Sequence, residues 1–582
     1  MNRMILLRVS ACLFVAACTL TSSGLAQSAK SKGASPVLAI AKSEVERDFG
    51  ALKDQPVPAY YLSYEIADSK IDTVSSAFGA LVSSDSSHKR AAHVSLRVGD
   101  YALDNTHPIR NMQGKIAAAF AAALSQVAVP FDDDPLPIRL VLWDETNKVY
   151  KSALTQLAAA KTDNGIQIEQ EDKSDDFSHE KPEQSVEPIP PMPFDRKLWE
   201  ERARRYTEPF HRYGDLYNAT ATITADQETR WFVSSDGAEI QSSTTYYRLI
   251  IQASSKADDG MILPRFESYA AFTPEGLPDD ATVLKAVDKM IADLKALRVA
   301  PVVDPYTGPA ILSGRATAVF FHEVFGHRVE GQRQKGEDEG QTFTKMVGQP
   351  VLPNFLSVDF DPTRRHYGGV DLVGSYSFDD EGVRARPVVA VENGILKSFL
   401  MSRSPIAGFA NSNGHGRAQA GMAPVARQSN LIIRNSKPVT REQLKKLLIV
   451  QIKQQNKPFG LLFDDIQGGF TLTMRALPNA FEVLPIMVYR IYPDGREELV
   501  RGVNLVGTPL AAFSKILAAD DEKAVFNGVC GAESGFVPVS ASGPAILISQ
   551  IEVQKNTKSQ ERAPILPAPI SAPLTANAGG AR

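Results

Sequence analysis

The stretch FFHEVFGHRVEG, residues 320–331, holds the side chains of this chain that are best suited to metal chemistry. It places His322, Glu323, His327 and Glu330 close together, whereas the whole chain of 582 residues has only 9 histidines. A metal lowers the pKa of a bound water, and an adjacent carboxylate can remove the proton during attack on a carbonyl. The pattern therefore predicts a hydrolytic metal site with Glu323 as the general base.

The spacing of the two histidines is unusual. Zinc proteases of the HExxH type carry histidines at i and i+4, on one face of a helix. Here the spacing is five, which on a regular α-helix separates the side chains by about 140°. We therefore expect an irregularity, either a one-residue π-bulge or a break near Gly326, because glycine tolerates unusual backbone angles. Ser313 is the expected cap of this helix and Gly331 its expected stop.

Two histidines do not complete a catalytic zinc site, which usually has three protein ligands and one open position for water. Glu330 is near in sequence and is either a ligand or a hydrogen-bond partner of His327. We favour the second role, because metal-bound histidines usually have such a partner. Cys530 is a distant candidate, and metal binding would explain why an exported chain keeps a single thiol outside its N-terminal segment.

The N-terminal segment is typical of an export signal. It is basic at first (MNRMILLR), then apolar (VSACLFVAACTL), and ends in small residues before Gln27. We expect cleavage after Ala26 and a periplasmic or secreted protein. The apolar run is too short for a permanent membrane span. An alternative processing site before Cys18 would leave a lipid anchor on that cysteine.

The composition limits the classes of function that we expect for the chain. The chain is 43% hydrophobic and 22% charged, which is ordinary for a folded protein. Its net charge of −4 offers no general attraction to nucleic acid, so we expect no nucleic-acid partner. The length is too great for one ordinary domain.

Helix-like and strand-like stretches alternate within residues 27–303, which we expect to form the N-terminal domain. Within it, the charged and then Pro-rich segment 161–194 lacks periodicity and is expected to be an exposed insertion. Residues 219–272 alternate as an antiparallel meander, with Asp236 and Gly237 in a hairpin turn. The expected helices cover 37–52, 116–128, the stretch from Arg196 and 280–297; further expected strands cover 60–66 and 93–99.

Residues 304–556 read mostly as strands and turns, interrupted by the histidine-bearing helix and by a helix over 441–455. Helices and strands in the first part and a strand-rich second part that carries the candidate metal-binding helix together predict an α+β fold. The tail 557–582 is of low complexity and is expected to be disordered.

The stretch YTGPAILSGRATAVFFHEVFGHRVEG resembles the signature of TldD/PmbA-type zinc metalloproteases. Further stretches resemble that family in the same order: SFDDEGVRARPVVAVENGILKSFLMSR, NSNGHGRAQ, FDDIQGGF and NGVCGAESGFVPVSASGPAILISQIEV. The resemblance implies zinc held by His322, His327 and Cys530, with Glu323 as the general base. It also implies an α/β N-terminal domain followed by a β-rich catalytic domain that carries a metal-binding helix. It further implies cleavage of short or unfolded peptides, and a homodimer or a pair with a related subunit. The insertion 161–194 and the export signal depart from the family pattern.

Other residues have weaker signals. His415 could bind substrate, but an exposed loop histidine is the preferred interpretation. The acidic run 379–381 is interpreted as a charged hairpin turn. Gly468 and Gly469 indicate a tight turn or a close backbone approach.

Two alternative functions stay open. The first is a non-catalytic partner subunit of a protease assembly, which would hold no metal. The second is a Cys/His hydrolase with Cys530 as the nucleophile, although VCGAESG has no local signature for one. Loss of activity on alkylation at saturating zinc would identify the second.

Overall fold

A computed structural model describes residues 35–555, apart from 109–125, 167–171, 336–338, 475–480 and 508–511, together with Leu566 and Pro569. The described residues from Ser35 to Lys555 form one compact unit. The predicted export signal, most of the predicted helix 116–128 and nearly all of the tail lie outside the described residues. Among the residues described, no helix combines the length and apolar character that crossing a bilayer requires.

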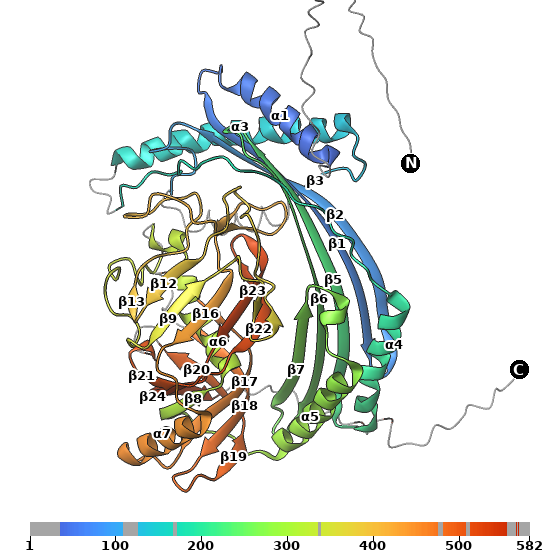
Figure 1. The fold of residues 1–582 in the computed structure, drawn as a ribbon, viewed down its shortest axis with the longest axis vertical. Helices are drawn as coiled ribbons and strands as arrows, with labels where there is room; N and C mark the ends of the chain where they lie inside the picture. Colours follow the sequence, from blue (N-terminus) through green and yellow to red (C-terminus); the bar gives the residue numbers. More distant parts are fainter. Residues whose placement is uncertain are drawn as a thin grey trace, which may run out of the picture. The chain divides into compact units, whose positions relative to one another are not determined.

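Long antiparallel strands dominate the first half of the chain (Figure 1). The sheet has the order β3-β2-β1-β5-β6-β4, and β7 also pairs with β6. The Asp236–Gly237 turn between β5 and β6 is confirmed, with Gly237 at φ 102°. The strands are β1 (Ala59–Ala77), β2 (Ala80–Val98), β3 (Val127–Ala128), β4 (Gln184–Val186), β5 (Leu216–Ser234), β6 (Glu239–Lys256) and β7 (Ile262–Ala271).

Helices pack on this sheet through apolar stripes. In α5 (Asp280–Val299) the buried side chains Val287, Met290, Ile291 and Leu294 recur at helical spacing, and Asp279 caps the first turn by accepting from the Thr282 amide. The other helices of this half are α1 (Pro36–Leu52), α3 (Pro135–Ile166) and α4 (Arg196–Thr207). The helices predicted from periodicity at 37–52, from Arg196 and at 280–297 are confirmed.

Most described residues of 161–194 are exposed or half-buried, as expected, but the segment also contains regular structure and a short buried part at 176–178. Helix α3 continues to Ile166, and β4 pairs in parallel with β6. Phe177 is buried between the guanidinium groups of Arg97 and Arg403, whose Cζ atoms lie 3.7 and 3.9 Å from its ring centroid. Sequence periodicity misses this segment because contacts from distant residues, rather than an apolar stripe of its own, hold it in place.

Among the described residues, the second half of the chain contains two large sheets, with helix α6 (Gly314–Val324) packed between them (Figure 1), and two small two-stranded sheets, β10 (His366–Tyr367) with β11 (Val370–Asp371) and β14 (Gly416–Arg417) with β15 (Val425–Ala426). One large sheet has the order β13-β12-β9-β16-β23-β22 and the other β17-β8-β24-β20-β18-β19, with β21 paired to β24. Phe320, Phe321 and Phe325 are fully buried in the core between them. Helix α7 (Arg441–Gln454) covers the second sheet. The predicted α+β class is confirmed.

The strands of the two large sheets have the following bounds: β8 (Tyr306–Leu312), β9 (Leu356–Phe360), β12 (Val388–Glu392), β13 (Ile395–Leu396), β16 (Asn430–Asn435), β17 (Gly460–Thr471), β18 (Phe481–Ile491), β19 (Glu497–Val500), β20 (Val503–Gly507), β21 (Ile516–Ala519), β22 (Ala524–Ala532), β23 (Gly535–Gly543) and β24 (Ile546–Lys555).

Candidate metal centre

Helix α6 ends inside the histidine motif. It begins after Ser313, whose Oγ accepts from the Ala316 amide at 3.3 Å, and it ends at Val324. A 3₁₀ turn, Gly326–Arg328, follows. The predicted break near Gly326 is therefore confirmed, whereas the predicted stop at Gly331 is wrong. Because the helix breaks between the two histidines, their spacing of five residues does not turn the imidazole rings about 140° apart, as it would on a regular α-helix.

Side-chain contacts fix this break. A Cβ on Gly326 would lie 1.9 Å from Oε1 of Gln428, so glycine is needed there for close packing. The Nη1 of Arg328 donates to the carbonyls of Glu323 and Val324 at 3.0 and 3.2 Å, which satisfies groups that the helix end leaves open. These contacts hold the break in the orientation that directs the second histidine.

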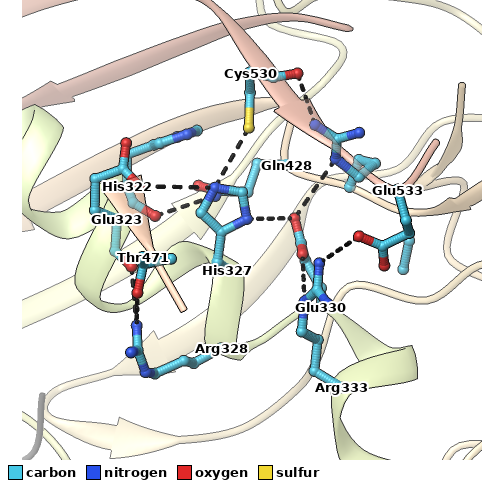
Figure 2. Close-up of polar contacts among 12 residues, drawn as sticks. His322, Glu323, His327, Arg328, Glu330, Arg333, Gln428, Thr471, Cys530 and Glu533 are labelled. Atoms are coloured by element: carbon cyan, nitrogen blue, oxygen red, sulfur yellow. Dashed lines mark hydrogen bonds and ion pairs between the residues drawn. The ribbon is translucent and has the colours of Figure 1, made fainter. Parts of the chain in front are cut away.

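The structure brings His322, His327 and Cys530 together (Figure 2). One ligand atom from each residue lies within 4.8 Å of the other two. The Sγ of Cys530 is 3.4 Å from Nε2 of His327, and the two imidazole centroids are 5.0 Å apart. Two nitrogens and one thiolate are donors that zinc accepts, and a fourth position would stay open in a tetrahedral site. The donor set therefore fits a zinc ion.

Glu330 supports His327 from the side opposite Cys530. Its Oε1 lies 3.2 Å from Nδ1 of His327, and its Oε2 accepts from Nε of Arg333 at 3.1 Å. Glu330 is fully buried. The carboxylate fixes the ring so that Nε2 faces the thiol, which is the arrangement that metal-bound histidines usually need. Glu330 thus occupies the supporting position that we favoured for it.

The ionisable groups of the cluster shift one another strongly. Burial opposes the charged form of His327. The proximity of Cys530 and Glu330 outweighs this effect and raises the pKa of His327 well above its ordinary value. Burial likewise opposes the thiolate, but His327 and His322 lower the pKa of Cys530 well below its ordinary value. The cluster therefore favours a thiolate, the form of cysteine that binds metals.

Glu323 lies beside the three candidate ligands. Its Oε2 is 3.9 Å from Nε2 of His327, and burial raises its pKa, although the two histidines oppose that effect. A Cβ on Gly469 would lie 2.8 Å from Cγ of Glu323. The predicted close backbone approach at Gly469 is thereby confirmed. Strand β17 can lie this close to Glu323 only because Gly469 has no side chain.

Two residues that sequence reasoning did not single out connect the parts of the cluster. Arg427 donates to the Cys530 carbonyl at 2.7 Å and to Ser534 Oγ at 2.8 Å, and so holds the β22–β23 hairpin. Gln428 donates to the His322 carbonyl at 3.1 Å. Both lie in RQSNLII, next to the Gly/Asn-rich loop, and no spacing rule marks them as supports of a metal site.

A pocket of about 530 Å³ opens onto the cluster. Its lining includes His322, Glu323, His327 and Cys530, residues 467–474 of β17 and the turn after it, and Arg248 from β6. The edge strand β22 lines it with Phe526 and residues 528–532. The candidate ligands are therefore accessible from a cavity large enough for part of a peptide.

The expectation for His415 is wrong, whereas the turn expected at 379–381 is present, since Phe378 and Arg384 form an antiparallel bridge on either side of it. His415 is fully buried rather than exposed, with Nε2 3.1 Å from Ser429 Oγ, and it does not line the pocket. Burial lowers its pKa to about 3. In the acidic run 379–381, Asp379 is buried and accepts from the amides of Gly416 and Val383, each at 2.9 Å. These side chains build the loops around the site.

Comparisons with known proteins identify metallopeptidase relatives. Residues 305–555 match the PmbA/TldA metallopeptidase C-terminal domain. A metalloprotease of Methanocaldococcus jannaschii is 26% identical over 54% of this chain and 65% of its own length. A zinc metalloprotease TldD homolog of Saccharolobus solfataricus is 25% identical over 42% of this chain and 51% of its length. The chain thus spans about half to two thirds of these relatives.

Solved structures share the fold. TldE from Thermococcus kodakarensis superimposes with a TM-score of 0.55 at 15% identity, covering 89% of this chain and 100% of that one. A Thermotoga maritima protein gives a TM-score of 0.57 at 16% identity, covering 88% and 99%. The resemblance in fold therefore extends well beyond the matched C-terminal domain.

Proposed function

The chain belongs to the TldD/PmbA metallopeptidase family, and on that premise we propose that it is an exported zinc metallopeptidase that hydrolyses short or unfolded peptides. One observation carries the proposal. His322, His327 and Cys530 offer three ligand atoms within 4.8 Å of one another, next to Glu323 and open to one pocket. Three protein ligands beside a carboxylate are the requirements of a catalytic zinc site.

Each residue has a defined task in this proposal. His322, His327 and Cys530 would hold the ion, which supplies a Lewis acid and lowers the pKa of water. Glu323 accepts the proton of the attacking water and delivers it to the leaving amine. Burial raises the pKa of Glu323, which makes its carboxylate a better proton acceptor than an exposed one.

The edge of β22 supports binding of an extended substrate. Among the described strands, β22 pairs only with β23 and ends its sheet. The Asn527 carbonyl faces away from β23, toward Arg248, and in an antiparallel strand every second residue presents its backbone to the same side. Val529 and Gly531 would then offer hydrogen bonds to an added strand. Unfolded peptides should therefore be cleaved much faster than folded proteins.

We also propose that the protein works in the periplasm or outside the cell and pairs with a second copy or a related subunit. The export-type N-terminus supports the first point, and the family resemblance supports the second. Lipidation at Cys18 is the alternative to cleavage after Ala26. Mass determination of the protein purified from its native membrane and soluble fractions distinguishes a lipidated Cys18 from an N-terminus at Gln27.

The test of catalysis is Glu323→Gln. This variant should keep its metal, because Glu323 is not a ligand in the proposal, and lose hydrolysis of an unstructured peptide by about 100-fold or more. Metal is measured by mass spectrometry and hydrolysis by product analysis. Glu442→Gln, on the surface of α7, is the matched control and should behave like wild type. Hydrolysis that survives in Glu323→Gln would contradict the assigned base.

The contact between Cys530 and His327 also suits a cysteine nucleophile with a histidine base. The two mechanisms respond oppositely to reagents. A chelator should abolish activity in the zinc enzyme and leave a cysteine hydrolase active. Protection of Cys530 from alkylation by saturating zinc, together with retained activity, supports the zinc enzyme.

A further inference from the structure

Arg248 brings a positive charge from the N-terminal sheet into the metal pocket. It lies on β6 and lines the same pocket as His322, His327 and Cys530. Its Nε donates to Ser268 Oγ at 3.3 Å, and its Nη2 donates to the Asn527 carbonyl of β22 at 3.5 Å. The guanidinium therefore lies where the sheet of the first half meets the edge strand that carries Cys530.

The charge of Arg248 has no counter-ion among the residues that the structure describes. The side chain is half-buried, both of its hydrogen-bond acceptors are neutral, and burial lowers its pKa. Arg333, which lines the same pocket, is different, since it pairs with Glu330, Glu339 and Glu533. A buried charge without a partner is costly. A guanidinium has five donors in a fixed fork, of which Arg248 uses two.

We propose that Arg248 is the anion-binding residue of this pocket and receives a carboxylate of the peptide substrate. The inference rests on the proposed peptidase function and narrows its substrate class. An arginine fork matches the two oxygens of a carboxylate, and desolvation in the pocket strengthens that pairing.

The position of Arg248 also indicates how far the carboxylate of the substrate lies from the scissile bond. It contacts Asn527, three residues before Cys530 in β22. At about 3.3 Å per residue, that contact lies about 10 Å along the strand from the cysteine. An extended peptide alongside β22 would therefore place its carboxylate about three residues from the scissile bond. The carboxylate is either the C-terminus of the peptide or an aspartate or glutamate side chain.

The experiment measures binding without turnover. Labelled heptapeptides are titrated by fluorescence anisotropy against zinc-loaded Glu323→Gln. One pair differs only in a free or amidated C-terminus, and a second set moves a single glutamate or glutamine along the chain. The free-acid or glutamate peptide should bind about 10- to 100-fold more tightly than its neutral partner, the range of a charge-assisted hydrogen bond. The first pair and the second set distinguish the two sources of the carboxylate.

Arg248 is then replaced in the same background. Arg248→Gln should remove the preference and leave binding of the neutral peptides unchanged, and Arg248→Lys should restore part of it. Arg434→Gln, an exposed arginine paired with Asp359, is the control and should keep the full preference. Absence of any preference in Glu323→Gln, or a preference that persists in Arg248→Gln, overturns the proposal. Because no hydrolysis is measured, this result is independent of the test of Glu323.

Discussion

The thiol of Cys530 lies 3.4 Å from Nε2 of His327, although 203 positions separate the two residues in the chain. The helix break at Gly326 directs the imidazole, and the β22–β23 hairpin delivers the thiol. Arg427 and Gln428, adjacent in sequence, hold these two elements through the Cys530 and His322 carbonyls. The candidate metal centre thus combines side chains from a broken helix with a side chain from an edge strand.

The first prediction concerns Cys530 as a ligand. Cys530→Ser should lower zinc affinity by more than the roughly 10- to 100-fold that loss of a supporting residue costs, because a hydroxyl does not replace a thiolate at zinc. Affinity is measured by competition with a chromophoric chelator. Val529→Ala, at the half-exposed neighbouring side chain, is the control and should keep wild-type affinity. Equal affinities in all three proteins would remove Cys530 from the site.

Glu330 should act through His327. Glu330→Gln removes the negative charge that faces Nδ1, and zinc affinity should fall by about 10- to 100-fold. Glu533→Gln also deprives Arg333 of a partner but does not touch His327, so it should leave zinc affinity near that of wild type. If the two variants lose the same affinity, the effect belongs to Arg333 and not to the ring.

Gly326→Ala tests the packing of the helix break. The added methyl would meet Gln428, and the variant should lose about 1–3 kcal/mol of unfolding free energy. Gly50→Ala is the matched control, because a Cβ at Gly50 in α1 meets nothing within 4 Å and should be neutral or stabilise by up to about 1 kcal/mol.

Chemical denaturation measures both variants. Adding Gln428→Ala to Gly326→Ala should recover part of the loss, since the obstructing side chain is gone. A double variant whose loss equals the sum of the single losses would show that Gln428 is not the obstacle.

His415 should make the fold sensitive to acid. Burial holds its folded pKa at about 3, below that of the unfolded chain. Its contribution is therefore full above about pH 6.5 and declines as the pH falls toward 3, reaching a loss of about 2 kcal/mol at pH 5. His415→Gln, which cannot be protonated in this range, should lose less unfolding free energy than wild type between pH 7 and 5. Parallel losses in the two proteins would assign the acid sensitivity to other groups.

Several features followed from sequence because the forces behind them are local. An apolar stripe at helical spacing and an aspartate cap are enough to specify α5. Asp236 and Gly237 between two alternating runs are enough to specify the β5–β6 hairpin. The motif around His322 and His327, with its excess residue, indicates both metal chemistry and an irregular helix, with either a π-bulge or a break. Each of these signals comes from residues near one another in the chain.

The contacts between distant segments depend on the tertiary structure. It placed the Cys530 thiol next to His327, buried His415, and inserted Phe177 between Arg97 and Arg403. It also left Arg248 in the pocket without a counter-ion among the described residues. No pattern in a single segment encodes these relationships, because burial and electrostatics depend on which surfaces meet when the sheets and helices pack.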